Sequence, residues 1–142
     1  MNMWIIFGLL AAVFAALVAI FGKMGLHDID TTTATTMRAI VMAIFLVVVI
    51  LIQGKIGHIE EIITNKKALY YIVLSGVAGA LSWLFYFVAL KLGKVSQVAP
   101  LDRLSVVFAI ILAALILGEK ISLKVGIGAA MMAVGAILIV LA

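Results

Sequence analysis

The sequence has no cysteine, a single proline and few charged residues. Among its 142 residues, 11% are Asp, Glu, Lys or Arg, and 8% are aromatic. The absence of cysteine excludes thiol nucleophiles, cysteine-ligated zinc, iron–sulfur clusters and disulfides. Charged residues make up about a quarter of a typical soluble domain. This chain therefore lacks the polar side chains that would cover a water-soluble surface.

Apolar residues fill the sequence instead, at 68% of the chain. A chain of this length has too little interior to hide so many apolar side chains from water. Lipid must therefore be its solvent, which excludes a soluble enzyme, a secreted disulfide scaffold and a disordered chain. The net charge of +4 does not indicate a nucleic-acid partner, because the basic residues are spread along the chain in ones and twos.

Five long apolar runs predict five transmembrane helices. Each run is close to the roughly 20 residues that cross a bilayer, and none alternates as the strands of a barrel do. The predicted helices lie at about Met3–Phe21, Thr33–Ile52, Ala68–Leu90, Val95–Leu117 and Leu123–Leu141. We therefore expect an all-α polytopic membrane protein with one five-helix domain over residues 1–142. The first run has no basic n-region, so we interpret it as a retained helix rather than a signal peptide.

The connectors carry helix start and stop signals. Asp30 or a following threonine is expected to cap the second span, Asn65 the third and Ser122 the fifth, while Gly118 ends the fourth. In the longest connector, Gln53–Lys67, isoleucines at helical spacing predict one or two turns of interfacial helix.

The basic residues are balanced between the two sides of the membrane. An odd number of spans puts the termini on opposite sides. The side with the N-terminus receives Lys55, Lys66, Lys67, Lys120 and Lys124. The opposite side receives Lys23, Arg38, Lys91, Lys94 and Arg103. Because the Lys/Arg excess normally selects the cytoplasmic side, two interpretations stay open: an N-terminus in the cytoplasm, or dual topology in which copies insert both ways.

Small residues form stripes along four of the predicted helices, which favours close packing in a compact bundle. The first and last helices carry only small residues on these faces, including Ala12, Ala15, Ala19 and Ala130. On the third and fourth helices the stripes also carry polar groups. These stripes hold Ser75, Gly79, Ser82 and Tyr86, and Asp102, Ser105, Ala109 and Ala113.

Three charges fall well inside predicted spans, namely Arg38, Asp102 and Arg103, whereas Lys124 lies in the first turn of the last span. A charge inside the bilayer is costly and indicates function by default. Counted from each helix midpoint, these three charges and the rings of Trp83 and Tyr86 lie roughly 5 to 9 Å from the midplane, toward one side. Their similar depth in one leaflet predicts a polar pathway through the bundle.

We expect Asp102 to pair with Arg38, which leaves Arg103 as a positive site suited to a carboxylate or phosphate. Trp83 and Tyr86 would supply a flat wall and a hydroxyl. Pro100 cannot donate to the carbonyl of Ser96, so a local helix break is expected there. The purely structural alternative is an Arg38–Asp102 ion pair that only holds two helices together, with the Arg103 side chain extending to the membrane interface.

Signals for catalysis and metal binding are weak. His27, Asp28 and Asp30 could contribute metal ligands, but no further ligand is near in the sequence, so we interpret them as solvated loop residues. The sequence has no phosphate-binding loop, nucleophile elbow or histidine pair. We therefore expect no enzyme activity, no cofactor and no metal site.

The C-terminal part, Phe85–Ala142, contains several recognisable motifs: Ala-Leu-Lys at 89–91, Ala-Pro-Leu at 99–101, Leu-Gly-Glu-Lys-Ile-Ser at 117–122 and a glycine-rich last helix. With these motifs it resembles the second part of an EamA-type domain of the drug/metabolite transporter superfamily. Met1–Leu51 fits the first two helices of the family more loosely. The resemblance implies one half of a ten-helix fold of two inverted halves, and a transporter that works by alternating access. It also implies that the third and fourth helices line the pocket.

We therefore expect a five-helix, half-size transporter of a small metabolite or amino-acid-like solute. It would work as a homodimer, with the antiparallel arrangement favoured, in a prokaryotic-type plasma membrane. Its expected partners are the solute, the lipid bilayer and a second copy, with no nucleic acid. The expected pathway residues are Arg38, Ser82, Trp83, Tyr86, Asp102, Arg103 and Ser105. The alternative is a non-transporting membrane scaffold or accessory subunit whose polar residues only lock helices.

Overall fold

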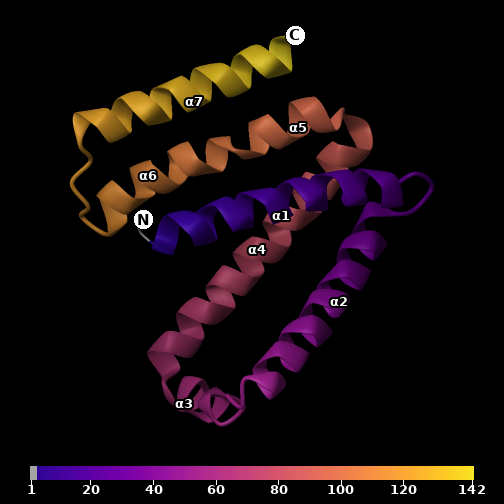
Figure 1. The fold of residues 1–142 in the computed structure, drawn as a ribbon, viewed down its shortest axis with the longest axis vertical. Coiled ribbons are helices and arrows are strands. Elements are labelled where there is room, and N and C mark those ends of the chain that lie inside the picture. Colours follow the sequence, from indigo (N-terminus) through magenta and orange to yellow (C-terminus); the bar gives the residue numbers. More distant parts are fainter. Residues whose placement is uncertain (1–2) are drawn as a thin grey trace. The chain divides into compact units, whose positions relative to one another are not determined.

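The computed structural model describes residues 3–142, and within that range its regular secondary structure is helical, with no strand (Figure 1). The helices are α1 Met3–Gly25, α2 Thr31–Ile52, α3 His58–Thr64, α4 Lys66–Leu92, α5 Val95–Asp102, α6 Leu104–Ile116 and α7 Leu123–Leu141. Long unbroken apolar runs form helices here because a helix satisfies all of its backbone hydrogen bonds internally, as lipid requires.

Five of these segments are long and apolar enough to cross a membrane. They are α1, α2, α4, the joined segment Val95–Ile116 formed by α5 and α6, and α7. The short α3 lies in the longest connector, where the isoleucine spacing predicts it. The expectation of an all-α polytopic membrane protein with five spans is thus confirmed.

The chain divides into two compact units, which are described separately. Unit 1 holds α1 up to Met24 together with Leu92–Ala142, and unit 2 holds Gly25–Lys91. The chain passes between the units at two points, at the last residues of α1 and of α4. The expectation of a single five-helix domain stays a prediction.

In unit 1, α7 packs against both α5 and α6. Its buried positions are alanines, Ala129 and Ala136, which allow neighbouring helices to approach closely. The amide of Gln97 on α5 donates to the carbonyl of Val140 near the end of α7 at 3.5 Å. At the end of α1, the ammonium of Lys23 donates to the carbonyl of Gly93 at 2.8 Å.

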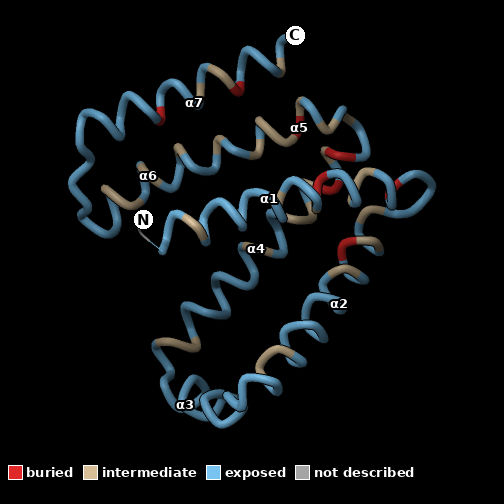
Figure 2. Tube along the Cα trace, viewed as in Figure 1, coloured by how far each residue is buried: buried red, intermediate tan, exposed pale blue. Residues whose placement is uncertain are grey.

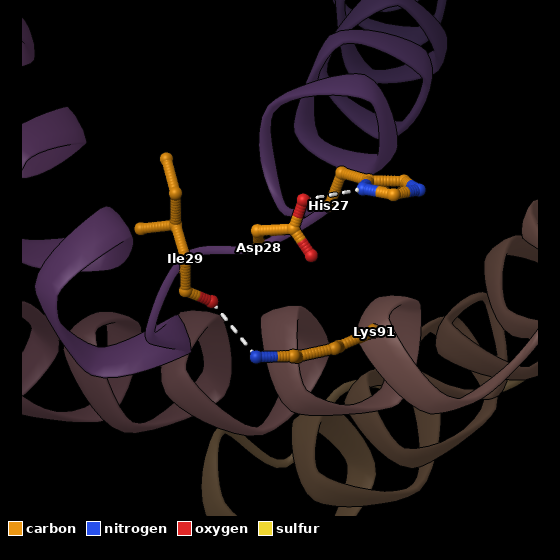
Figure 3. A network of polar contacts seen from close by, with 4 residues as sticks. All are labelled: His27, Asp28, Ile29 and Lys91. Atoms are coloured by element: carbon orange, nitrogen blue, oxygen red, sulfur yellow. Dashed lines mark hydrogen bonds and ion pairs between the residues drawn. The ribbon is translucent and has the colours of Figure 1, made fainter.

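In unit 2, burial is concentrated where α2 begins and α4 ends (Figure 2). The buried residues of this unit are Leu26, Thr35, Phe87 and Leu90. At the same end, the ammonium of Lys91 on α4 donates to the carbonyl of Ile29 in the α1–α2 connector at 2.8 Å (Figure 3). The buried contacts of unit 2 are therefore at this end, whereas α3 is exposed throughout.

The predicted helix signals match the structure. The Asp30 carboxylate accepts from the backbone N–H of Thr33 at the start of α2, and the Ser122 hydroxyl accepts from Val125 at the start of α7. The side chain of Asn65 accepts from the N–H of Ala68 at 3.1 Å, in the first turn of α4. Gly118, just after α6, has φ +69, a left-handed conformation that glycine adopts at little cost.

The fourth span breaks at a different place from the one predicted. The α-helix runs through Pro100 and ends at Asp102, because the fixed φ of proline is compatible with a helix. The break falls at Arg103, whose N–H bonds to the carbonyl of Pro100 at 3.1 Å, while its own carbonyl accepts from Val106 at 3.1 Å. These short-range bonds form a tight 3₁₀-like turn between α5 and α6.

Candidate functional site

Unit 2 contains an open groove between α2 and α4, called here the α2–α4 groove, with a volume of about 520 Å³. Its lining residues are Thr35, Thr36, Arg38, Ala39, Met42, Ala43, Leu46, Gly76, Gly79, Ala80, Trp83 and Leu84. Small residues on both helices leave this space. The polar side chains gather where α2 begins, and the lining becomes apolar toward Leu46 and Gly76.

Arg38 lies at the polar end of this groove, over the face of an indole. Its guanidinium carbon is 3.5 Å from the centroid of the Trp83 ring and 5.5 Å from that of Phe87. A cation over an aromatic face is attracted by the ring quadrupole, more strongly where water is excluded. The structure thus brings together two predicted pathway residues, Arg38 on α2 and Trp83 on α4, which are 45 positions apart in the chain.

The rings of α4 form a cluster around this contact. Trp83 meets Tyr86 edge to face at 5.5 Å between centroids, with an interplanar angle of 90°, and meets Phe87 at 5.9 Å. Phe87 is buried and Trp83 is half-buried. The edge-to-face arrangement is the favoured geometry for aromatic pairs, so the indole is held in place for Arg38.

The guanidinium of Arg38 contacts no hydrogen-bond acceptor or carboxylate within the described residues of unit 2. Stacking uses the face of the guanidinium, and its five N–H donors lie in the plane and stay available. The predicted partner, Asp102, belongs to the other unit, so the Arg38–Asp102 pair stays a prediction.

Unit 1 contains a second open groove, of about 490 Å³, between α1, α5 and α7, called here the α1–α5–α7 groove. Its lining residues are Ala12, Ala15, Ala16, Ala19, Ala99, Pro100, Arg103, Met132 and Ala136. Arg103 is the charged member of this lining, and it is exposed. The alanine face of α1, which the sequence assigns to packing, therefore lines a groove that contains a charge.

The other predicted site residues lie as follows. Asp102 is half-buried in unit 1, and no ion pair joins it to Arg103 within the described part of that unit. Ser105 is exposed on α6 and Ser82 is exposed on α4. Neither serine lines a groove described above. A single pathway shared by these residues and the two arginines stays a prediction.

The residues considered as weak metal ligands lie in the α1–α2 connector. The Nδ1 atom of His27 is 2.9 Å from a carboxylate oxygen of Asp28, and both side chains are almost fully exposed (Figure 3). Within residues 3–142, no group of three or more potential ligands gathers. Asp30 is engaged in its helix cap, where the backbone N–H of Thr33 lowers the pKa of the carboxyl below its usual range.

Sequence reasoning missed three residues near Arg38: Phe87, whose ring lies beside its guanidinium, and Thr35 and Thr36, which line the α2–α4 groove. Phe87 follows Trp83 by four positions, a spacing that places two side chains on one helix face, so its role could have been read from the sequence. Thr35, three positions before Arg38, follows the same rule. Its hydroxyl donates to the carbonyl of Thr31 at 2.7 Å, and that of Thr36 donates to Thr32 at 2.9 Å.

Comparison with known proteins identifies one family over residues 2–141. The EamA-like transporter family matches residues 2–141. A protein of a Sinorhizobium species, described as an uncharacterized transporter in the cobO 3' region, is 40% identical over 136 residues, which cover 96% of this chain and 95% of that protein. An uncharacterized protein of Methanocaldococcus jannaschii is 31% identical over 139 residues, which cover 98% of this chain and 97% of that protein. No solved structure matches the chain.

Proposed function

Because the chain belongs to the EamA-like transporter family and is a multi-pass membrane transporter, we propose that it moves a small metabolite or amino-acid-like solute, as an exporter or exchanger. Its work would be transport rather than catalysis, in keeping with the family. We place it in the plasma membrane of a prokaryotic-type cell.

The observation that carries this proposal is a pair of arginine-bearing grooves in the membrane-spanning part of the chain. Arg38 lines the α2–α4 groove and Arg103 lines the α1–α5–α7 groove. Charged side chains within transmembrane segments face a bundle interior or a water-filled cavity, and they mark substrate pathways. Both grooves have volumes in the range of small-molecule sites, roughly 300 to 1,000 Å³.

A second copy would complete the pathway. Arg103 is exposed on the isolated chain, at the break between α5 and α6. Contact with lipid at this depth would be costly for a guanidinium, so we infer that a partner chain or the solute pathway covers it. Five spans are half of the ten that the ten-helix fold of this family uses, which also favours a dimer.

An antiparallel arrangement agrees with the balanced distribution of basic residues. The two sides receive five Lys and Arg residues each, so the charge bias selects neither orientation. Two copies of opposite orientation would form the inverted pair from which many transporters are built. Rocking of the two copies around a central site would then alternate access between the two sides of the membrane.

Transport can be tested in liposomes reconstituted with the purified protein. The external probe is a mixture of the proteinogenic amino acids and short-chain carboxylates, and their accumulation is measured by mass spectrometry. We expect at least one solute to accumulate faster than in protein-free liposomes, and Asp102→Asn and Arg103→Gln to abolish this while the dimer remains intact by size-exclusion chromatography. Lys120→Gln, which removes a charge from the α6–α7 connector, is the matched control.

Loss of the dimer in the Asp102 and Arg103 variants, with no solute moved by the native chain, would instead support the scaffold alternative.

The orientation of the chain in the membrane is tested separately, in a chain that lacks native cysteine. Single cysteines replace Asp28 in the α1–α2 connector or Glu60 in α3, and intact cells receive a membrane-impermeant maleimide. Dual topology predicts partial labelling at both positions. Labelling at one position alone would rule out the antiparallel homodimer.

A further inference from the structure

Two of the polar side chains that line the α2–α4 groove, Arg38 and Trp83, are hydrogen-bond donors without an acceptor among the described residues of unit 2. Arginine and tryptophan side chains can only donate hydrogen bonds. The hydroxyls of Thr35 and Thr36 already donate to carbonyls of their own helix. Within unit 2, the described residues supply no acceptor to the N–H groups of Arg38 or to the indole N–H of Trp83. A ligand at this end of the groove must therefore accept hydrogen bonds.

The charge of the groove is positive. Among the described residues, Arg38 is the one ionisable side chain that lines it. The acidic residues of unit 2 lie in connectors or in α3: Asp28, Asp30, Glu60 and Glu61. The Asp30 carboxylate is occupied by the N–H and hydroxyl of Thr33, at 2.8 and 2.9 Å. A planar guanidinium binds a carboxylate through two parallel hydrogen bonds, so an anionic group with planar geometry fits this end.

The rest of the groove is apolar. From Arg38 the lining continues through Ala39, Met42 and Ala43 to Leu46 on α2, and faces Gly76, Gly79 and Ala80 on α4. At 1.5 Å per residue, the distance along α2 from Arg38 to Leu46 is about 12 Å. An aliphatic chain of the length of octanoate would occupy this stretch.

We propose that the α2–α4 groove binds an aliphatic monocarboxylate, with the carboxylate on the Arg38 guanidinium beside Trp83 and the apolar body along the small residues toward Leu46. This inference rests on the proposed transport function, because it names the class of solute that the chain would carry. The indole holds the guanidinium from one face and leaves its N–H edge for the carboxylate.

The fluorescence of Trp83 can report binding on its own once Trp4, the other tryptophan of the chain, is replaced. In a Trp4→Phe background, the protein is placed in nanodiscs of uncharged phosphatidylcholine and titrated with octanoate and hexanoate. We expect a saturable change in Trp83 fluorescence with both acids, and none with octanamide or octylamine. Arg38→Lys should weaken binding at least ten-fold because it removes the two-pronged contact, and Lys55→Gln, which removes a charge from a connector of the same unit, should leave binding unchanged.

Four outcomes would overturn the assignment. The first is equal binding of octanamide, which would remove the need for a charge. The second is native affinity in Arg38→Lys together with loss of binding in Arg103→Gln, which would move the anion to unit 1. The third is binding that appears only in Asp102→Asn, which would show that the native Arg38 is already occupied by Asp102. The fourth is a response confined to nanodiscs with anionic phosphatidylglycerol, which would assign the groove to a lipid headgroup.

The failure of this inference and of the proposed function can be told apart. If Trp83 does not respond to monocarboxylates but reconstituted liposomes still accumulate another solute in an Asp102-dependent way, transport stands and the solute class is wrong. If octanoate binds through Arg38 but no solute crosses the liposome membrane, the site stands and the transport proposal is wrong. Size-exclusion chromatography and circular dichroism confirm that each variant is folded.

Discussion

The two units each place one arginine in a membrane-spanning groove, but they surround it differently. In unit 2, Arg38 is half-buried and stacked on Trp83, within an aromatic cluster on α4. In unit 1, Arg103 is exposed at a helix break, in a groove lined mostly by alanine. Unit 2 thus shields its charge with its own side chains, whereas unit 1 leaves its charge exposed.

Small and aromatic residues have different consequences for such a groove. An alanine-lined surface provides room but no directional contact, so it suits close approach of another helix. An aromatic ring provides a large contact area and fixes the orientation of a cation. We therefore expect unit 2 to be sensitive to changes at the ring, and unit 1 to be sensitive to changes that fill its groove.

The largest effect is expected from Trp83→Ala. This change removes a large side chain that contacts Arg38, Tyr86 and Phe87, and loss of such a ring costs about 3 kcal/mol when the site cannot collapse. The matched change in unit 1 is Met132→Ala, at an exposed position in the groove of Arg103, with an expected loss below about 1 kcal/mol. Unfolding in mild detergent measures both, and equal losses would contradict the contrast between the units.

The next effect is expected within unit 1, from two alanines on the same groove. Ala19 is 2% exposed, whereas Ala12 is exposed. Ala19→Leu forces a larger side chain into occupied space and should cost about 1 to 3 kcal/mol. Ala12→Leu should change stability by less than about 0.5 kcal/mol but should lower liposome transport, because it fills the groove. Unchanged transport in Ala12→Leu would argue that this groove is not part of the pathway.

A smaller effect is the coupling between Arg38 and Trp83. A double-mutant cycle with Arg38→Gln and Trp83→Leu should give a coupling energy of about 1 to 2 kcal/mol, the size of a desolvated cation–π contact. The same cycle in unit 1, with Arg103→Gln and Met132→Leu, should give a value close to zero, because the described residues place no aromatic ring in that groove. Similar values in the two units would show that the ring contact does not stabilise Arg38.

Much of the fold could be predicted from the sequence, because lipid leaves an apolar run of this length little choice but a helix. The last span, Leu123–Leu141, has the predicted ends, since Ser122 offers a clear cap. The break at Arg103 was predicted one turn earlier, where Pro100 cannot donate to the carbonyl of Ser96. Proline marks a missing donor in the sequence, but the geometry of the neighbouring turns decides where the helix yields.

The candidate site was predicted less completely. Arg38, Trp83 and Tyr86 are recognisable because a charge or a polar ring inside an apolar run is conspicuous. The pairing of Arg38 with Trp83 was not predicted, because it depends on the register between α2 and α4, which no single-sequence pattern fixes. The alanines of α1 were assigned to packing alone, since a stripe of small residues looks the same whether it faces a helix or a groove.

The smallest expected effect concerns the two helix caps, one in each unit. In unit 2, hydrogen bonds from Thr33 lower the pKa of Asp30, so the folded state favours the carboxylate. Its stabilising effect is therefore complete above the ordinary aspartate pKa of about 3.9, and is lost as the pH falls through the lowered value of the folded state. In unit 1, the cap is the hydroxyl of Ser122, which does not titrate in this range.

The melting temperature of the native chain should thus fall more on acidification than that of Asp30→Asn, which keeps a neutral cap. Ser122→Ala, in contrast, should lower the melting temperature by the same amount at every pH. Identical pH profiles for the native chain and Asp30→Asn would show that the Asp30 cap contributes no pH-dependent stability.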